Sequence, residues 1–122
     1  MKNIIVVDDS PAILDSVELM LNFEGFKVQK FAKGSEMLEK IKHQQKPDAI
    51  LMDMWLSGED GRDICRLVRK DENLKDVPVV IMSASTALAQ SAVDAGADSF
   101  IAKPFDLGEM LDVIVSYTEH QN

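Results

Sequence analysis

Three aspartates and one lysine in this chain are spaced so that they could act together on a phosphate group. Asp8 and Asp9 follow the first apolar run of the sequence, Asp53 follows the third, and Lys103 follows the fifth. Adjacent carboxylates repel one another unless a cation or a proton joins them. Oxygen-only ligands suit Mg²⁺ better than zinc. A carboxylate beside Mg²⁺ and an ammonium group can attack a phosphoryl group, so the pattern predicts magnesium-assisted phosphoryl chemistry.

Five short apolar runs, which are candidate strands, alternate with five longer amphipathic stretches. The runs are Ile4–Val7, Phe26–Phe31, Ala49–Met52, Val77–Met82 and Ser99–Ala102. Three of them are nearly continuous in Ile, Val, Leu and Met, as in parallel strands that are covered on both faces. The second run contains Lys27 and Lys30, which favours an edge position.

The stretches between the runs carry apolar residues at helical spacing. The predicted apolar stripes are Ile13, Val17, Met20 and Leu21; Leu38 and Ile41; Ile64, Leu67 and Val68; and Leu107, Met110, Leu111 and Ile114. The alanine-rich stretch Thr86–Ala95 has the weakest stripe. Side chains that can cap helix starts are Ser10 (before Pro11), Ser35 and Asp106. Gly25 and Gly96 are placed where helices should end.

This alternation predicts a single domain over residues 1–122 of the α/β class. Right-handed crossovers between parallel strands give a doubly wound, flavodoxin-like (βα)5 sheet with strand order 2-1-3-4-5. Sites in such sheets lie beyond the carboxyl ends of the strands, at the switch point between strands one and three. Asp8, Asp9 and Asp53 should converge there, with Ser83 and Lys103 arriving from strands four and five.

Composition excludes several other classes of protein. The chain has 122 residues, of which 46% are hydrophobic and 28% charged, which argues against disorder. No apolar run approaches the roughly 18–20 residues that span a bilayer, and the N-terminus is too short for a secretory signal. The single cysteine, Cys65, cannot form an internal disulfide, so a cytoplasmic location is expected. The net charge of −8 disfavours direct nucleic-acid binding, although acidity alone usually indicates only solubility.

The order of these residues resembles the receiver domain of two-component response regulators, of the single-domain type found in chemotaxis. The matching pieces are Asp8-Asp9, Met52-Asp53-Met54, Gly61, Ser83-Ala84 and Phe100-Ile101-Ala102-Lys103-Pro104-Phe105. Each piece is weak by itself. All of them in order, each at or just after a predicted strand end, cover essentially the whole chain and make a strong signal.

The resemblance implies a role for each matched residue. Asp53 is then the phosphoacceptor, and Asp8 and Asp9 bind Mg²⁺ together with Asp53 and the main-chain carbonyl of Trp55. The remaining implied roles are the switch hydroxyl of Ser83, the switch aromatic ring of Phe100 and the phosphate-pairing ammonium of Lys103, with a cis bond before Pro104 as is frequent in the family.

The implied function is a signalling module rather than a metabolic enzyme, whose only chemistry is its own phosphorylation and dephosphorylation. A histidine kinase or a phosphotransfer protein would supply the phosphoryl group. The surface formed by the fourth helix, fifth strand and fifth helix would then change for a protein partner, in a monomer or a phosphorylation-dependent dimer. No output domain follows in this chain. A stand-alone regulator and a piece of a longer protein both stay open, and the absence of a linker-like end favours the first.

Three alternatives fit less well. A flavodoxin-like FMN binder needs a Ser-, Thr- or Gly-rich loop where Asp8 and Asp9 would repel the FMN phosphate. A haloacid-dehalogenase-like phosphatase needs a second Asp at the position of Trp55. A degenerate receiver that only binds proteins would not need the intact set of acids and lysine. Two departures from the family pattern stand out: Ser57 replaces a frequent proline, which predicts a more mobile loop, and Trp55 is bulky enough to cover the site unless it points to solvent.

Overall fold

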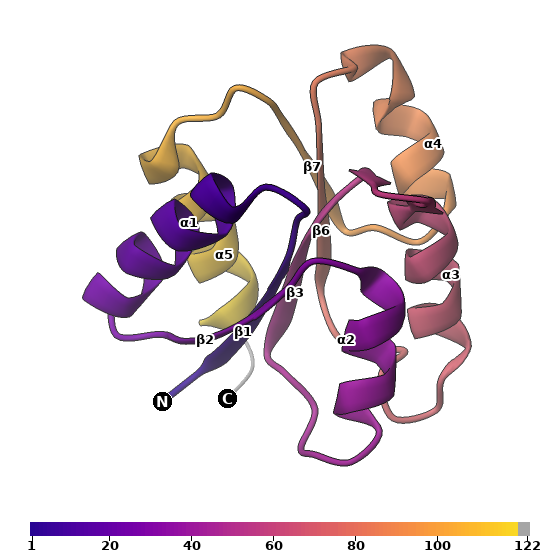
Figure 1. The fold of residues 1–122 in the computed structure, drawn as a ribbon, viewed down its shortest axis with the longest axis horizontal. Helices are drawn as coiled ribbons and strands as arrows, with labels where there is room; N and C mark the ends of the chain where they lie inside the picture. Colours follow the sequence, from indigo (N-terminus) through magenta and orange to yellow (C-terminus); the bar gives the residue numbers. More distant parts are fainter. Residues whose placement is uncertain (120–122) are drawn as a thin grey trace.

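Five parallel strands form one sheet in the computed structural model, which describes residues 1–119 (Figure 1). The strands are β1 (Asn3–Val7), β2 (Lys27–Phe31), β3 (Ala49–Asp53), β6 (Val79–Ser83) and β7 (Ser99–Ala102). Their order is β2-β1-β3-β6-β7. Because β6 and β7 are the predicted fourth and fifth strands, the order predicted from the sequence is confirmed, with the lysine-containing strand β2 at an edge.

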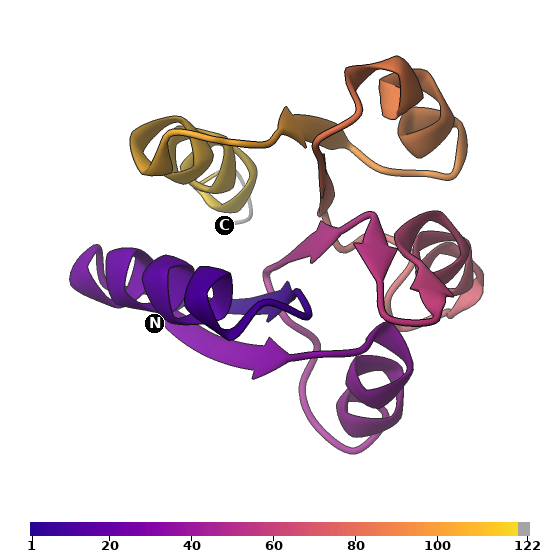
Figure 2. The same cartoon turned by 45° about the horizontal axis from the view of Figure 1, so that its top comes forward.

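Helices cover both faces of this sheet. Figures 1 and 2 show α1 (Pro11–Phe23) and α5 (Leu107–Thr118) on one face, and α2 (Gly34–Ile41), α3 (Gly61–Lys70) and α4 (Ala89–Asp94) on the other. A short 3₁₀ turn, η1 (Thr86–Leu88), precedes α4. Alternate strand residues enter two separate apolar clusters: Ile5 and Val7 face α2–α4, whereas Ile4 and Val6 face α1 and α5. No helix in residues 1–119 is long and apolar enough to cross a membrane.

Helix starts agree with the sequence in two cases and differ in one. Ser10 and Asp106 each accept a hydrogen bond from a backbone N–H of the first turn, at 3.4 and 2.8 Å. The prediction that Ser35 caps α2 is wrong. That helix begins at Gly34, and the N–H groups of Gly34 and Ser35 donate to the carboxylate of Glu59 at 2.7 and 3.3 Å. A side chain distant in sequence replaces the local cap.

The apolar face of α3 differs from the predicted stripe. Ile64, Cys65 and Val68 are buried against the sheet, whereas Leu67 is 50% exposed. At 100° per residue, the three buried positions span one narrow stripe and Leu67 falls outside it. Burial raises the pKa of the Cys65 thiol, so this side chain packs in α3 as a small apolar group.

A small antiparallel hairpin follows β3 where the sequence predicts only a loop. It pairs β4 (Trp55–Leu56) with β5 (Glu59–Asp60) around Gly58. Gly58 has φ +75°, a left-handed conformation that most residues avoid, so a glycine suits this turn.

The predicted ends of two helices are confirmed at Gly25 and Gly96, which also have positive φ angles. The polar C-terminal sequence Glu119-His120-Gln121-Asn122 predicts a frayed end, but residues 120–122 lie outside the described residues.

Candidate functional site

The structure brings the three predicted acids together at the carboxyl ends of the two neighbouring strands β1 and β3. Strands β1 and β3 are neighbours in a parallel register, so the end of β3 at Asp53 lies beside the residues that follow β1. One carboxylate oxygen each from Asp8, Asp9 and Asp53 lies within 4.8 Å of the others. Asp8 and Asp53 are buried, whereas Asp9 is exposed. The cluster is therefore open to solvent on the Asp9 side.

Lys103 directly follows the carboxyl end of β7, and its side chain contacts this cluster. Its Nζ lies 2.9 Å from Oδ2 of Asp8 and 3.3 Å from Oδ1 of Asp53. The backbone N–H of Lys103 donates to the carbonyl of Ser83 at 2.9 Å, which fixes the lysine to the neighbouring strand β6. The peptide bond between Lys103 and Pro104 is cis, as predicted. One ammonium thus serves two buried carboxylates.

The charges in the site are not balanced by this lysine. Burial raises the pKa of Asp53, and the charges of Asp8 and Asp9 add to that rise, although Lys103 opposes it. Burial by itself would lower the pKa of Lys103, but the hydrogen bond to Asp8 and the charge of Asp53 outweigh burial and raise it. Three carboxylates facing one ammonium form a set of hard oxygen donors with excess negative charge. Such a set fits Mg²⁺, which binds a few carboxylates and keeps several waters.

Ser83 and Phe100, the predicted switch pair, lie on adjacent strands. Ser83 is the last residue of β6 and is buried, and its hydroxyl accepts a hydrogen bond from the N–H of Ser85 at 3.0 Å. Phe100 in β7 is half-buried and packs against the apolar cluster beneath α2–α4. Strand alternation places both side chains on that same face of the sheet.

The chain matches the model of the response regulator receiver domain over residues 4–115. It belongs to that family. This receiver domain is 38% identical over 116 residues to RpaA, a DNA-binding dual master transcriptional regulator of Synechocystis; the match covers 91% of this chain and 46% of that protein. The chain therefore spans about half the length of the curated relatives it matches.

Two solved structures have the same fold as this receiver domain. Chemotaxis response regulator CheY4 of Vibrio cholerae is 26% identical with a TM-score of 0.89, covering 96% of this chain and 98% of that one. The receiver domain of sensor histidine kinase PA1611 from Pseudomonas aeruginosa is 29% identical with a TM-score of 0.86, covering 97% and 98%. That structure has a magnesium ion coordinated in its active site cleft. The predicted family and the flavodoxin-like fold are thus confirmed.

The two departures from the family pattern both lie on the β4–β5 hairpin. The Ser57 hydroxyl donates to Oδ2 of Asp9 at 2.8 Å, so the residue found in place of proline contacts a predicted metal ligand. The Trp55 side chain is 51% exposed, and the guanidinium carbon of Arg62 lies 5.0 Å from the centroid of its ring. Metal binding by the Trp55 carbonyl, shielding by its ring and greater loop mobility stay predictions.

Gly61 brings the end of the hairpin against the acceptor strand. Its N–H donates to the carbonyl of Met54 at 2.6 Å. A Cβ at Gly61 would lie 2.6 Å from the carbonyl oxygen of Asp53, closer than real Cβ contacts allow. This close approach explains why a glycine stands eight residues after the predicted phosphoacceptor.

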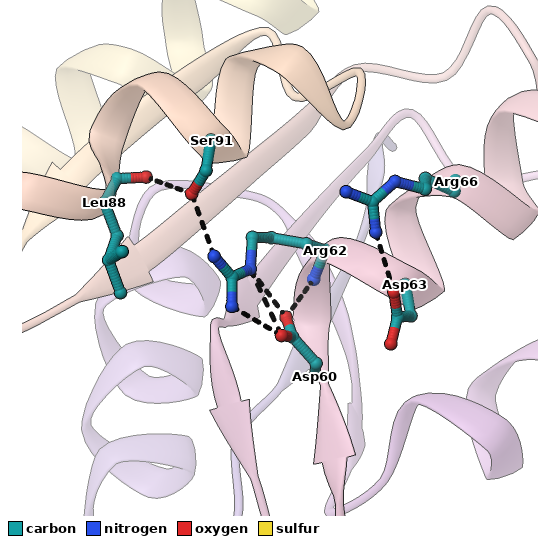
Figure 3. Close-up of polar contacts among 6 residues, drawn as sticks. All are labelled: Asp60, Arg62, Asp63, Arg66, Leu88 and Ser91. Carbon is teal, nitrogen blue, oxygen red and sulfur yellow. Dashed lines mark hydrogen bonds and ion pairs between the residues drawn. The ribbon is translucent and has the colours of Figure 1, made fainter.

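Sequence reasoning missed the charged residues that hold this hairpin in place. Glu59 accepts the first N–H groups of α2, as described above. Asp60 caps α3 by accepting the N–H of Arg62 at 2.9 Å, and it binds the Arg62 guanidinium through both carboxylate oxygens (Figure 3). The only available signal was an Asp directly before a helix start, which is a common N-cap. No sequence pattern indicated that Glu59 accepts hydrogen bonds from α2 or that Arg62 donates one to α4.

Proposed function

We propose that this receiver domain accepts a phosphoryl group on Asp53 in a Mg²⁺-dependent reaction. The observation that carries the proposal is the buried Asp53 carboxylate, which shares a 4.8 Å cluster with two other acids and lies 3.3 Å from the Lys103 ammonium. Membership of the receiver family and the magnesium in the active site cleft of the PA1611 receiver domain support it.

A carboxylate oxygen of Asp53 forms the new bond to phosphorus while the bond from phosphorus to the donor atom breaks. The donor is the phosphohistidine of a kinase or phosphotransfer protein, or a small acyl phosphate. Asp8, Asp9, Asp53 and the main-chain carbonyl of Trp55 would hold Mg²⁺, which would supply positive charge beside the phosphoryl oxygens. Lys103 leaves its ion pair with Asp53 and pairs with a phosphoryl oxygen instead. Hydrolysis of the acyl phosphate then restores Asp53, so this chemistry is a signalling cycle rather than metabolic catalysis.

The phosphoryl group changes the α4–β7–α5 surface through Ser83 and Phe100. The Ser83 hydroxyl gives up the hydrogen bond that it accepts from the N–H of Ser85 and donates to a phosphoryl oxygen instead. Phe100 then moves further into the space that this change opens. The light packing of α4, in which only Ala92 is buried, supports this direction of change. The remodelled surface serves an unidentified protein partner or a second phosphorylated copy.

The test is intact-mass analysis after incubation with acetyl phosphate and Mg²⁺. The wild type gains the mass of one phosphoryl group, and omission of Mg²⁺ prevents the gain. Asp53→Asn keeps the shape of the side chain but cannot form the acyl phosphate, so it gains nothing. Asp63→Asn, which changes an exposed aspartate on α3, is the matched control and labels normally. Labelling of Asp53→Asn at the wild-type rate contradicts the proposal.

A further inference from the structure

Arg62 connects three elements that meet beside the phosphoacceptor. Its guanidinium group binds both carboxylate oxygens of Asp60 on β5, with Nη2 at 2.6 Å and Nε at 3.0 and 3.2 Å. Nη1 donates to the Ser91 hydroxyl on α4 at 3.0 Å, and the same guanidinium lies over the ring of Trp55 on β4. Figure 3 shows this side chain extending from the start of α3 between Asp60 and Ser91.

One end of this connection lies on the hairpin that directly follows Asp53. Trp55 lies two residues after Asp53, and it pairs with Asp60 across the hairpin. The N–H of Gly61 closes the hairpin by donating to the carbonyl of Met54. A displacement of the backbone after Asp53 therefore moves Trp55 and Asp60, two of the three groups that contact the Arg62 guanidinium.

The other end of the connection is the first turn of α4, where Leu88 packs against the apolar cluster under α2–α4 but no side chain caps the helix. Its N-cap position, Leu88, makes no side-chain hydrogen bond to the helix, and Ala92 is the only residue of α4 that is buried. The Ser91 hydroxyl donates to the Leu88 carbonyl at 2.8 Å while it accepts from Arg62 (Figure 3). Arg62 thus contacts the first turn of α4 through Ser91, whose hydroxyl is also hydrogen-bonded to the backbone of that turn.

We infer that Arg62 is a positioning residue that couples the hairpin beside Asp53 to the first turn of α4. The inference rests on the proposed function of Asp53, and it adds a second connection to the one through Ser83 and Phe100. Arginine suits this role because its planar fork can bind a carboxylate through two nitrogens and still donate from a third. A lysine offers one point charge and cannot hold Asp60, Ser91 and the face of Trp55 in the same way.

Arg66 is a matched control one turn further along α3. Its Nη1 donates to Asp63 on its own helix at 2.7 Å, and the dashed line drawn from Arg66 in Figure 3 runs to that residue. Arg62→Gln and Arg66→Gln therefore remove the same charge from the same helix, but only the first breaks the link to α4. Ser91→Ala breaks that link from the opposite end without touching Trp55 or Asp60.

The experiment is amide hydrogen exchange on the full chain, with and without Mg²⁺ and beryllofluoride as a phosphoryl mimic. In the wild type and Arg66→Gln, the mimic changes exchange over residues 86–95. In Arg62→Gln and Ser91→Ala this change is smaller by about fivefold, the lower end of typical couplings between sites. Because Ser91 also holds the guanidinium that binds Asp60, Ser91→Ala also raises exchange over residues 55–60 in the unmodified protein.

Wild-type exchange in both regions for Arg62→Gln and Ser91→Ala overturns the inference. Acetyl phosphate labelling, measured separately by mass, reports on the proposed function. If the wild type takes up no phosphoryl group while Ser91→Ala still alters residues 55–60, the proposed function fails and the link stands. If labelling is normal and neither region responds to the two substitutions, the link fails and the proposed function stands.

Discussion

Helices α1 and α4 each follow a strand whose carboxyl end lies at the site, yet the two helices are built differently. Helix α1 has 13 residues, begins with a Ser10 cap and buries Val17 and Leu21. Helix α4 has six residues, has no capping side chain and buries only Ala92. Asp8 and Asp9, two of the three acids that would hold a cation, therefore precede the better-packed helix, whereas Ser83 precedes the lightly packed one.

This difference separates two requirements of a switch. Residues that hold a ligand need fixed geometry, which well-packed elements provide. An element that responds must move at low free-energy cost, so it has few buried apolar contacts. Here the first requirement is met on the α1 side and the second on the α4 side, which gives a comparison that experiments can test.

The largest expected difference is in stability. Leu21→Ala removes a fully buried side chain from α1 and should lower the free energy of unfolding by about 3 kcal/mol. Ala92→Gly, the corresponding loss in α4, should lower it by about 1–2 kcal/mol. Urea denaturation followed by circular dichroism measures both values. Equal losses would show that α4 is packed as firmly as α1.

Cation binding should act on the α1 side. Mg²⁺ should stabilise the wild type against thermal unfolding, by about 2.7 kcal/mol at a concentration 100 times Kd. Asp9→Ala removes one donor from the cluster and should reduce this stabilisation at the same Mg²⁺ concentration. Asp15→Ala, an exposed aspartate on α1 that pairs with Lys30, should leave the Mg²⁺ response unchanged. An unaltered response in Asp9→Ala would rule this residue out as a ligand.

Phosphorylation should act on the α4 side. Exchange rates of amides over residues 86–102 should change by about tenfold, equivalent to 1.4 kcal/mol of local stability. Those of residues 13–23 in α1 should stay within twofold or so. Hydrogen exchange with mass spectrometry measures both segments in one sample. Changes confined to residues 53–61 would mean that the signal does not reach α4.

The smallest expected effect is at the cap that joins the hairpin to α2. Burial by itself would raise the pKa of Glu59, but hydrogen bonds from Ser35 and Gly34 outweigh it and lower the pKa below the usual 4.5. The folded state then binds fewer protons than the unfolded state, so this stabilisation is complete above 4.5 and is lost as the pH falls through the lowered value.

Glu59→Gln keeps one acceptor oxygen but turns an NH2 group toward the second backbone N–H, so it should reduce stability by about 1 kcal/mol at pH 7. The difference from the wild type should shrink as the pH falls below the usual pKa of 4.5 and through the lowered pKa of Glu59. Denaturation at several pH values measures it. Glu72→Gln, at an exposed glutamate paired with Lys75, is the control and should show little difference at any pH. A Glu59→Gln deficit that stays constant down to pH 3 or so would exclude the carboxylate as its cause.

The sequence by itself determined the sheet, its strand order and the meeting of the acids. Nearly continuous apolar runs alternate with amphipathic stretches, and parallel strands bring their carboxyl ends to one edge. Asp8, Asp53 and Lys103 were therefore predictable as neighbours. The carboxyl ends of strands β3 and β6 differ from the prediction by one residue. Asp53 and Ser83 are the last residues of β3 and β6, whereas the sequence predicted that each follows its strand.

Only the tertiary structure decided how the hairpin after Asp53 is held. Ser35 has the residue type of a cap, yet Glu59 supplies the acceptor because the hairpin folds against the start of α2. Arg62 reads locally as one charge on a polar helix, but its partner Ser91 is 29 residues away. Local patterns report periodicity and capping preference. Long side chains that bridge separate elements depend on where those elements come to lie, which the packing of the whole domain determines.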